Sequence, residues 1–424
     1  MEGYDPLKDP GDFLGIDGFH HSVILTHLRY QLEEALRTAN ESIAKDFYGE
    51  KSKLLLHAAR HVYPDADNLG YRRIKDAWGA ERLAGNSEII YPKIGIPENP
   101  KQLHEHWSGL SMAEKDGLYR VDPFIGNRDG IPQLERDRYN RQTLDVLRAQ
   151  AKKRGDTEAL EGLGKIKGLL KPSDDGLPPS YLSYIDGESR FVYALDNPDT
   201  AKNVVIELLP ASRGVEARVE YVKATVKQLR QAAISVDPNA ETSVILWGAY
   251  KSPVTLPEAL YYGPAERAAG GVRQYHEGLR ITHQGPPSNN PTIGHSYGSV
   301  LGGHAAGHGN SLNTDNLVFV GSWGTGVKRV DDLRLTGVVP EDTSRHVFAT
   351  LAKHDPVQLM PAIHEILPTH RGFHAINIGA DSTPSKYWAG WNPEVHMTSH
   401  YYKSGSPSLR NIALIMTGHG NLVT

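Results

Sequence analysis

The pattern of apolar and polar positions changes at about residue 181, where short apolar runs begin to alternate with helical periodicity. Val204–Leu209 is apolar except for Glu207, as expected of a strand that is covered on both faces. The apolar residues that follow recur at spacings of 4, 3, 4, 3 and 4, which places them on one face of a helix: Val215, Val219, Val222, Val226, Leu229 and Ala233. The pattern therefore predicts a buried strand followed by an amphipathic helix.

The same alternation continues toward the C-terminus. Strands are predicted at Tyr181–Asp186, Arg190–Asp196, Val244–Trp247, Thr292–Ile293, Leu317–Val320, His346–Leu351 and His374–Ile378, and helices at Pro257–Leu279 and Ser299–His308. Strands that alternate with helices form a mostly parallel sheet with helices on both faces. We therefore predict an α/β fold for residues 176–424.

Residues 1–175 lack the alternation of β-branched residues that is typical of strands, and we predict a helical N-terminal region there. Ser111 and Glu114 form an S-x-x-E capping box, which indicates the start of a helix. The polar segment Lys152–Ser180 is rich in Gly, Pro and Asp and is the best candidate for a linker. We expect the N-terminal region to be a lid, a secretion handle or a packing domain beside a catalytic domain at 176–424.

Composition excludes several classes of protein. With 46 basic and 50 acidic residues among 424, the chain lacks the charge excess of a nucleic-acid binder. It has no cysteine, which excludes disulfides, thiolate zinc sites and a cysteine nucleophile. It shows neither a membrane-spanning apolar run of roughly 20 residues nor the basic start and apolar core of a Sec signal peptide. We expect a globular protein without a membrane span, either cytoplasmic or exported without a Sec signal peptide.

The candidate chemistry begins at Gly294–Gly298, which matches the motif G-x-S-x-G between an apolar run and a helix of small residues. In a nucleophile elbow this motif forms a tight strand-to-helix turn that holds the serine hydroxyl above the sheet. The flanking glycines are needed because the serine backbone is strained and the helix passes close by. Ser296 is therefore the candidate nucleophile, and His295 is expected to point away from the top of the sheet as a packing residue.

A serine nucleophile needs a base that accepts its proton and an acid that orients the base. On an elbow the chain order is Ser, then Asp or Glu, then His. Asp355 follows a predicted strand directly and is the preferred acid, with Asp381 as the alternative. His400, just before the segment SGSPSL that starts a helix, is the preferred base, and His396 is the alternative.

Acyl transfer also needs hydrogen-bond donors at the place where the oxyanion forms, each contributing roughly 3 kcal/mol. We expect the first donor to be the backbone N–H of Tyr297, which follows the nucleophile. The second is expected in the loop after the Val204–Leu209 strand, where Ala211 or Ser212 is the candidate. The same loop is also compatible with an ordinary turn.

Two histidine pairs have the i, i+4 spacing that metal sites use on helices: His57 with His61, and His304 with His308. No third ligand with a suitable spacing accompanies His57 and His61, so we interpret them as ordinary helix residues. The spacings of His304 and His308 to His354, His364, His370 and His374 match no metal motif, and no carboxylate accompanies the pair. We therefore expect neither a metal nor another cofactor.

With these pieces in place, the chain resembles an α/β-hydrolase family of unknown function that is abundant in actinobacteria and carries the elbow G-H-S-Y-G-S. The similarity spans roughly residues 100 to 420, in ordered blocks: the W-x-x-L-S helix (Trp107, Leu110, Ser111), IGNRDGIP (125–132) with Asn140-Arg141, NPDTAKNV (197–204), LWGAYKSP (246–253), GHSYGS (294–299), DNLVFVGSWGTGV (315–327), HDPV (354–357) and SPSLRNIA (406–413). The resemblance implies a serine hydrolase with Ser296 and Asp355 at the nucleophile and acid positions.

The chain departs from this family at two places. Where the family has P-G-T after the third strand, this chain has Pro210-Ala211-Ser212, so the family pattern does not identify the oxyanion donor of this loop. The late histidine of the family stands a few residues before an aromatic residue and further from the S-L helix than His400 does, which keeps His396 as an alternative.

We therefore expect a serine hydrolase that forms an acyl-enzyme on carboxylic esters, with a small-molecule, lipid or cell-envelope ester as its substrate. A peptidase or amidase with the same triad is the alternative enzyme, and a binding module that kept the elbow without turnover is the alternative from another class. Some members of the family carry N-terminal helices like those of type VII secretion substrates. The helix predicted at Val23–Ala44 is compatible with that route, although it lacks the W-x-G turn.

Overall fold

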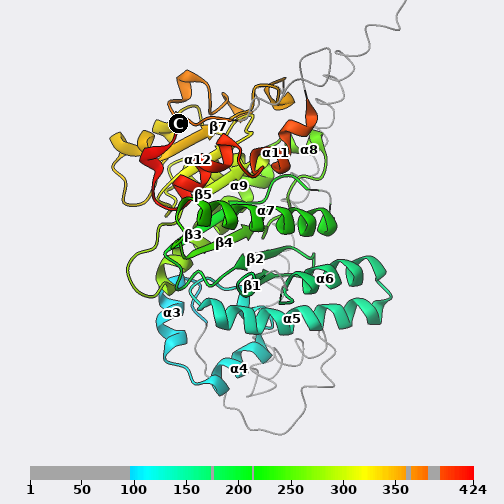
Figure 1. The fold of residues 1–424 in the computed structure, drawn as a ribbon. Helices are drawn as coiled ribbons and strands as arrows, with labels where there is room; N and C mark the ends of the chain where they lie inside the picture. Colours follow the sequence, from blue (N-terminus) through cyan, green and yellow to red (C-terminus); the bar gives the residue numbers. More distant parts are fainter. Residues whose placement is uncertain (1–95, 173–175, 213, 360–363, 381–391) are drawn as a thin grey trace, which may run out of the picture. The chain divides into compact units, whose positions relative to one another are not determined.

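The structure is a computed structural model that describes residues 96–172, 176–212, 214–359, 364–380 and 392–424. The chain divides into two compact units, Met1–Ile89 and Ile90–Thr424. All described residues belong to the second unit, which contains the sheet (Figure 1).

Several predictions concern residues outside the described ranges. These are the helix at Val23–Ala44, the pair His57 and His61, and the alternative acid Asp381. The division between a helical region and a catalytic domain at residue 175 also stays a prediction.

Eight strands form one sheet in the order β1-β2-β4-β3-β5-β6-β7-β8. β2 runs antiparallel to both β1 and β4, and all other neighbouring strands are parallel. The strands are β1 (Ser180–Ile185), β2 (Phe191–Leu195), β3 (Asn203–Leu208), β4 (Thr242–Trp247), β5 (Thr292–His295), β6 (Leu317–Val320), β7 (Val347–Thr350) and β8 (Ile376–Asn377). The mostly parallel sheet is confirmed, and every predicted strand is present.

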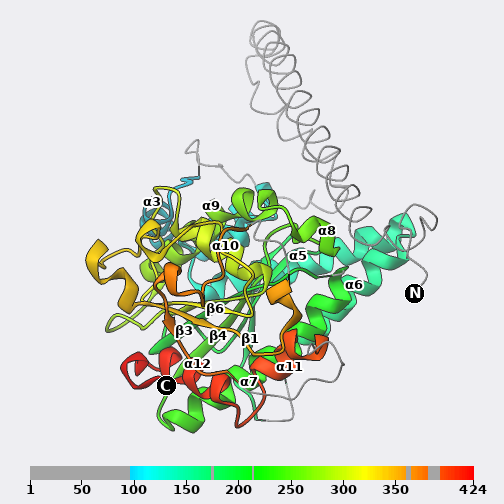
Figure 2. The ribbon, with the colours of Figure 1, turned by 90° about the horizontal axis from the view of Figure 1, so that it is seen from above.

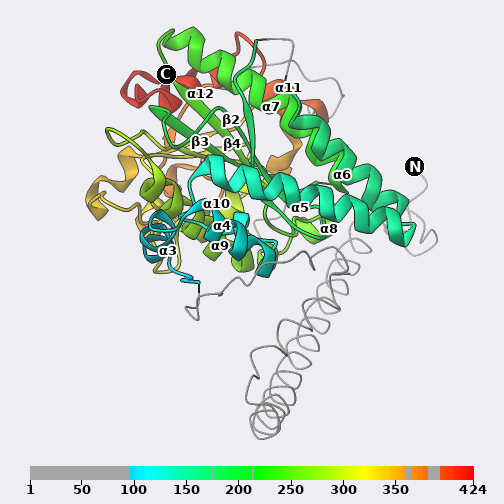
Figure 3. The same ribbon diagram turned by 90° about the horizontal axis from the view of Figure 1, so that it is seen from below.

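Helices cover both faces of this sheet, as predicted (Figure 2). α7 and α12 pack together on one face, and α9 and α10 on the other (Figure 3). The helices of the described residues are α3 (Pro100–Ser108), α4 (Met112–Val121), α5 (Gln133–Arg154), α6 (Thr157–Leu169), α7 (Gly214–Val236), α8 (Leu256–Ala259), α9 (Gly263–Thr282), α10 (Tyr297–Ala306), α11 (Thr398–Tyr401) and α12 (Pro407–Met416).

The apolar face predicted for α7 is the buried face. Val219, Val222, Val226, Leu229 and Ala233 are all buried in the main core cluster, with strand residues of the sheet. Burying a Val or Leu side chain contributes about 1.5–3 kcal/mol each. The periodicity in the sequence therefore fixes which side of this helix meets the sheet.

The helix predicted over Pro257–Leu279 is in fact two helices, α8 and α9, which are separated by Leu260–Tyr262. Pro264 lies in the first turn of α9. Proline has no N–H, and its ring clashes with the carbonyl group four residues earlier, so a continuous helix cannot pass through this point. The first turn of a new helix accepts proline without either cost.

The predicted linker Lys152–Ser180 contains helix α6. The Asp156 side chain caps this helix by accepting the N–H of Ala159 at 3.0 Å. Leu163 and Ile166 are buried in the main core. This segment therefore folds as part of the second unit, because its few apolar residues lie on one helical face.

Side chains of the segment before the sheet occupy the outer edge of β1. Asn127 both donates to the carbonyl of Ile185 (2.8 Å) and accepts its N–H (3.0 Å). From α5, Asp137 accepts the N–H of Leu182 at 2.7 Å. Further α5 side chains donate to carbonyl oxygens of β1: Arg136 to Ser183, Asn140 to Leu182 and Arg141 to Ser180. Among the described residues β1 pairs only with β2, and side chains of Asn127 and of α5 thus bind backbone groups along its other edge.

Candidate active site

The G-x-S-x-G motif forms a tight turn between β5 and α10. Ser296 lies between the last residue of β5 and the first residue of α10, with φ 53° and ψ −121°. This conformation is one that residues with a Cβ rarely adopt. A Cβ on Gly294 would lie 2.6 Å from the carbonyl oxygen of Gly298, and a Cβ on Gly298 would clash with the carbonyl oxygen of Leu208. Both positions therefore require glycine, as the motif predicts.

A chain of hydrogen bonds links Ser296 to Asp355 through His396. Nε2 of His396 lies 2.9 Å from Oγ of Ser296. Nδ1 of His396 lies 3.1 and 3.0 Å from the two carboxylate oxygens of Asp355. Because a carboxylate only accepts, Nδ1 carries the proton of a neutral imidazole, and Nε2 can accept the proton of the serine hydroxyl.

The sheet brings these three residues together from distant parts of the chain. Ser296 follows β5, Asp355 follows β7, and His396 ends the 3-10 helix η8 (Pro393–His396) after β8. The carboxyl ends of parallel strands meet at one edge of a sheet, which is where ligands bind in such folds. Ser296 and His396 are 100 positions apart in the sequence and are nevertheless in hydrogen-bond contact.

Asp355 is fully buried and has a complete set of donors. Besides His396, the N–H of Val357 donates to Oδ1 at 2.8 Å and the hydroxyl of Tyr401 donates to Oδ2 at 2.6 Å. Burial raises the pKa of Asp355, but the hydrogen bonds and charge of His396 and the bonds from Tyr401 and Val357 outweigh it, so this pKa lies below its ordinary value. Asp355 is therefore a carboxylate at neutral pH.

The structure places the two candidate histidines differently. His396, and not the preferred His400, lies between Ser296 and Asp355. His400 is in α11, where its ring packs edge to face on Tyr401 with 5.8 Å between the ring centroids. The reason is the path of the chain: η8 already reaches the edge of the sheet, and α11 then turns the next residues into the core.

The predicted oxyanion donors lie beside the elbow, and the structure distinguishes between the two candidates in the loop after β3, Ala211 and Ser212. Tyr297 directly follows Ser296 and is the first residue of α10, at the positive end of the helix dipole. The N–H of Ser212 donates to the carbonyl oxygen of Pro253 at 2.9 Å, so it is not directed at Ser296. Among the described residues, the N–H of Ala211 has no acceptor. Ala211 is therefore the better candidate in this loop, which follows β3 next to β5.

Two residues of this site were not predicted from the sequence. The ring of His295 packs as expected, and it also forms a hydrogen bond, since its Nε2 lies 2.9 Å from the carbonyl oxygen of His396. Tyr401 binds Asp355 and also accepts the N–H of Ala352 at 3.0 Å. The sequence offers only a weak signal for them, the aromatic run at 400–402 and the position of His295 inside the motif.

Behind the site lies a buried carboxyl group on β3. Glu207 is fully buried and accepts hydrogen bonds from the hydroxyls of Tyr221 (2.6 Å) and Tyr402 (2.8 and 2.9 Å). Burial raises the pKa of Glu207 to about 8, although the two tyrosine hydroxyls lower it in part. Glu207 therefore keeps its proton over most of the neutral range.

The described residues contain no group of three or more His, Cys, Asp or Glu side chains that is placed to hold a metal ion. His304 and His308 stack with 4.5 Å between ring centroids and line a cavity of about 450 Å³. Burial lowers the pKa of His304 to about 4. In the same part of the chain, no helix combines the length and apolar character needed to cross a bilayer.

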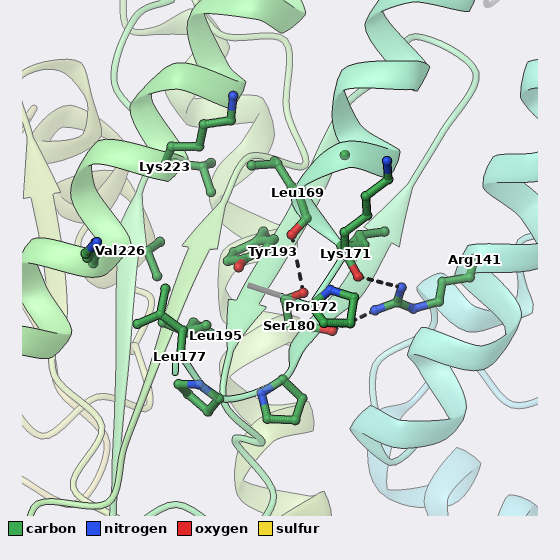
Figure 4. A pocket seen from close by; sticks show the side chains of 16 residues that line it. Arg141, Leu169, Lys171, Pro172, Leu177, Ser180, Tyr193, Leu195, Lys223 and Val226 are labelled. Atoms are coloured by element: carbon green, nitrogen blue, oxygen red, sulfur yellow. Dashed lines mark hydrogen bonds between the residues drawn. The ribbon is translucent and has the colours of Figure 1, made fainter. Parts of the chain in front are cut away.

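A larger cavity, of about 680 Å³, lies beside α6 and α7 (Figure 4). Its wall includes Tyr193 and Leu195 of β2, and Arg141, which donates to the carbonyl oxygen of Ser180 at 2.7 Å. Leu195 pairs with Val244 near the beginning of β4. The cavity therefore lies toward the amino ends of the parallel strands, away from Ser296 at their carboxyl ends.

Comparison with known proteins gives a family match in the middle of the chain. Residues 186–365 match a family described as Alpha/beta hydrolase. This range includes Ser296 and Asp355 and ends before His396. The match covers less than half of the chain.

Two curated relatives are uncharacterized proteins from Mycobacterium tuberculosis, of strains CDC 1551 / Oshkosh and ATCC 25618 / H37Rv. Each is 26% identical to this chain in an alignment 391 positions long, and the alignment covers 79% of this chain and 57% of the relative. The chain thus spans little more than half the length of these relatives.

Solved structures with similarity to this chain include two esterases. A carboxyl esterase 2 from Tuber melanosporum has a TM-score of 0.35 at 13% identity, covering 59% of this chain and 90% of its own. An esterase from Pyrobaculum calidifontis has a TM-score of 0.33 at 15% identity, covering 65% and 93%. Scores this low carry no argument, so the assignment depends on the family match and the topology. The protein has the α/β-hydrolase fold, and the part of its chain that carries the elbow matches the family described as Alpha/beta hydrolase.

Proposed function

We propose that the protein is a serine hydrolase that cleaves carboxylic esters through an acyl-enzyme. Ser296 is the nucleophile, His396 the general base and Asp355 the acid that orients the base. The observation that carries this proposal is the placement of His396, whose two ring nitrogens lie 2.9 Å from Ser296 Oγ and 3.0 Å from Asp355. His396 replaces His400, the base expected from the sequence.

In the proposed reaction, Ser296 Oγ attacks the ester carbonyl carbon while Nε2 of His396 takes the hydroxyl proton. Asp355 holds the Nδ1 proton and stabilises the imidazolium that forms. The tetrahedral intermediate then collapses, and His396 returns the proton to the leaving alcohol. A water molecule repeats these steps on the acyl-enzyme, which releases the carboxylic acid and restores Ser296.

The negative charge on the intermediate needs donors that are already oriented, and each such donor lowers the barrier by roughly 3 kcal/mol. We assign this role to the backbone N–H groups of Tyr297 and Ala211. Their placement at the start of α10 and in the loop after β3 supports the assignment. The dipole of α10, with its positive end at the elbow, adds to the stabilisation of the oxyanion.

Exposed apolar side chains next to the site favour an apolar substrate. Met397 follows His396 directly and is 57% exposed, and Leu359 ends the 3-10 helix η5 (Pro356–Leu359) after Asp355 and is 59% exposed. Apolar surface near a site removes apolar parts of a ligand from water. We therefore propose carboxylic esters with an apolar acyl chain, including lipid or cell-envelope esters, as the substrate class.

The test is labelling with a fluorophosphonate probe, followed by mapping of the adduct by mass spectrometry. We expect one adduct on Ser296 in the wild type and none in Ser296→Ala, whereas Ser311→Ala, at an exposed serine, should label like the wild type. Folded wild-type protein that takes no label would contradict the proposal and favour the binding module. Rates on matched p-nitrophenyl esters and p-nitroanilides then separate an esterase from the amidase or peptidase alternative.

A further inference from the structure

We propose that His295 is a positioning residue that holds the main chain of the base, so that the strand carrying the nucleophile also fixes His396. This inference rests on the proposed function, because it takes His396 as the base. Neither the elbow motif nor the family match assigns a role to this residue.

The contact has a defined direction. Nε2 of His295 lies 2.9 Å from the backbone carbonyl oxygen of His396. A carbonyl oxygen only accepts, so Nε2 of His295 carries a proton and donates. His295 is the last residue of β5, and Ser296 follows it. The nucleophile and the base are therefore both held by the end of the same strand.

The surroundings hold the His295 ring in this orientation. It is only 5% exposed and stacks on Tyr221 of α7 at 6.3 Å between centroids. Tyr401 and Tyr402 approach it at 6.0 and 6.3 Å. Nδ1 of His295 has no hydrogen-bond partner among the described residues, so the bond to His396 is the ring's polar anchor.

The segment that carries His396 needs such an anchor because its own structure is short. η8 and α11 have four residues each. The segment is tied to the loop after β7 by the N–H of Asn392, which donates to the carbonyl oxygen of His354 at 3.0 Å. The bond from His295 ties it to β5 as well. A base at the end of a short segment is thereby held from two strands.

The charge state of His295 also suits this role. Burial, and then the nearby His396, lower the pKa of His295 to about 3, while its hydrogen bond to His396 and the charge of Asp355 act in the other direction. The other titratable groups around the ring are the hydroxyls of Tyr221, Tyr401 and Tyr402, with Glu207 behind two of them. A neutral donor is needed because His396 becomes an imidazolium 5.4 Å away during the reaction, and a second cation would oppose this step.

The experiment compares His295→Met with His295→Gln in the full chain. Methionine fills similar space without a donor, whereas the amide nitrogen of glutamine can take the place of Nε2. We expect kcat for a p-nitrophenyl ester to fall about 10- to 100-fold in His295→Met with KM nearly unchanged, because a small displacement of the base is sufficient for such a loss. His295→Gln should recover most of kcat. Equal activity of His295→Met and wild type, or no recovery in a folded His295→Gln, would overturn the proposal.

A second measurement does not depend on turnover or on the folding of a variant. In wild-type protein labelled with ¹⁵N-histidine, NMR should show His295 as a neutral ring protonated at Nε2 and unchanged from pH 5 to 8. A ring that titrates in this range, or that is protonated at Nδ1 alone, would overturn the inference. Failure of the fluorophosphonate probe to label Ser296 would instead contradict the proposed function, so the two failures are distinguishable.

Discussion

The hydroxyl of Tyr401 lies 2.6 Å from Oδ2 of Asp355, the same carboxylate oxygen that faces Nδ1 of His396 at 3.0 Å. Tyr402, the next residue, binds the buried Glu207 instead. Two consecutive residues, the last of α11 and its C-cap, thus donate hydrogen bonds to Asp355 and to the carboxyl group behind it. The five predictions below concern these contacts and the elbow.

Tyr401→Phe should weaken both the site and the fold. The substitution removes a hydrogen bond to a charged group, worth about 1.5–3 kcal/mol, and leaves the N–H of Ala352 without its acceptor. We expect kcat for an ester to fall about tenfold and the free energy of unfolding in urea to fall by about 2 kcal/mol. Tyr262→Phe, at a half-exposed tyrosine, is the control and should change neither quantity.

The same variant should change the acid sensitivity of the protein. The pKa of Asp355 in the folded state is below its ordinary value of 3.8, so Asp355 contributes stability above that pH, and the contribution is lost as the pH falls through the lower folded value. Without the Tyr401 hydroxyl the folded pKa rises, and less of this stability is present at pH 5 to 7. The stability difference between Tyr401→Phe and wild type should therefore shrink as the pH is lowered from 5 to 3, and a difference in urea midpoint that is the same at both pH values would contradict the role given to Tyr401.

Gly298→Ala should be strongly destabilising, because its Cβ would meet the carbonyl oxygen of Leu208 on the neighbouring strand. Neither backbone can move without disturbing β3 or the start of α10, and we expect a loss of about 3 kcal/mol or more together with all esterase activity. Gly164→Ala in α6 is the matched control, since nothing lies within 4 Å of its Cβ position. There the substitution should raise the free energy of unfolding by about 0.5–1 kcal/mol, because alanine is the better helix former. Thermal unfolding of both variants tests the pair.

Ser296→Gly should be more stable than Ser296→Ala. Both variants lose the hydroxyl, but only glycine adopts a φ of 53° with a ψ of −121° without strain. Backbone strain of this kind costs about 1–3 kcal/mol, so we expect a difference of at least about 1 kcal/mol in chemical denaturation. Equal stability of the two variants would show that the elbow stores no strain at this residue.

Glu207→Gln should remove a pH dependence of stability. The folded pKa of Glu207 is about 8, against an ordinary value of 4.5, so the folded state binds the additional proton. The wild type should therefore lose stability as the pH rises from about 4.5 to about 8, and above that range no further loss arises from this group. Glutamine is neutral throughout, and its advantage over the wild type should grow across this window. If the difference in unfolding free energy between Glu207→Gln and wild type were the same at pH 5 and at pH 8, the raised pKa assigned to Glu207 would be contradicted.

Much of the fold was predictable because local periodicity reports burial directly. The apolar face of α7 and the run Val204–Leu209 are visible as spacings in the sequence, and both lie in the core. The apolar pattern continues across the break at Leu260–Tyr262, so periodicity alone predicts one helix there, and only Pro264 signals the new start. Helix α6 was missed because glycines and lysines outnumber its buried residues.

The candidate site was predictable in part. Ser296 and Asp355 are fixed by the motif and by a strand end, and the structure places both at one edge of the sheet. His396 and His400 are four residues apart in a segment with few regular elements, so the sequence could not tell which one faces Asp355. That choice depends on contacts with residues far away in the sequence: the Tyr401 hydroxyl binds Asp355, and the His295 ring binds the carbonyl oxygen of His396.

The hydrogen bonds from Asn127 and α5 to β1 have a consequence for the behaviour of the protein at high concentration. An open strand edge is a template on which strands of other molecules can add, and this is a common route to aggregation. Here the side chains of Asn127, Asp137 and Asn140 already occupy backbone groups that an incoming strand would need. Loss of these side-chain hydrogen bonds, rather than loss of core packing, would therefore expose β1 as an edge to which strands of other molecules can add, while the sheet behind it stays folded.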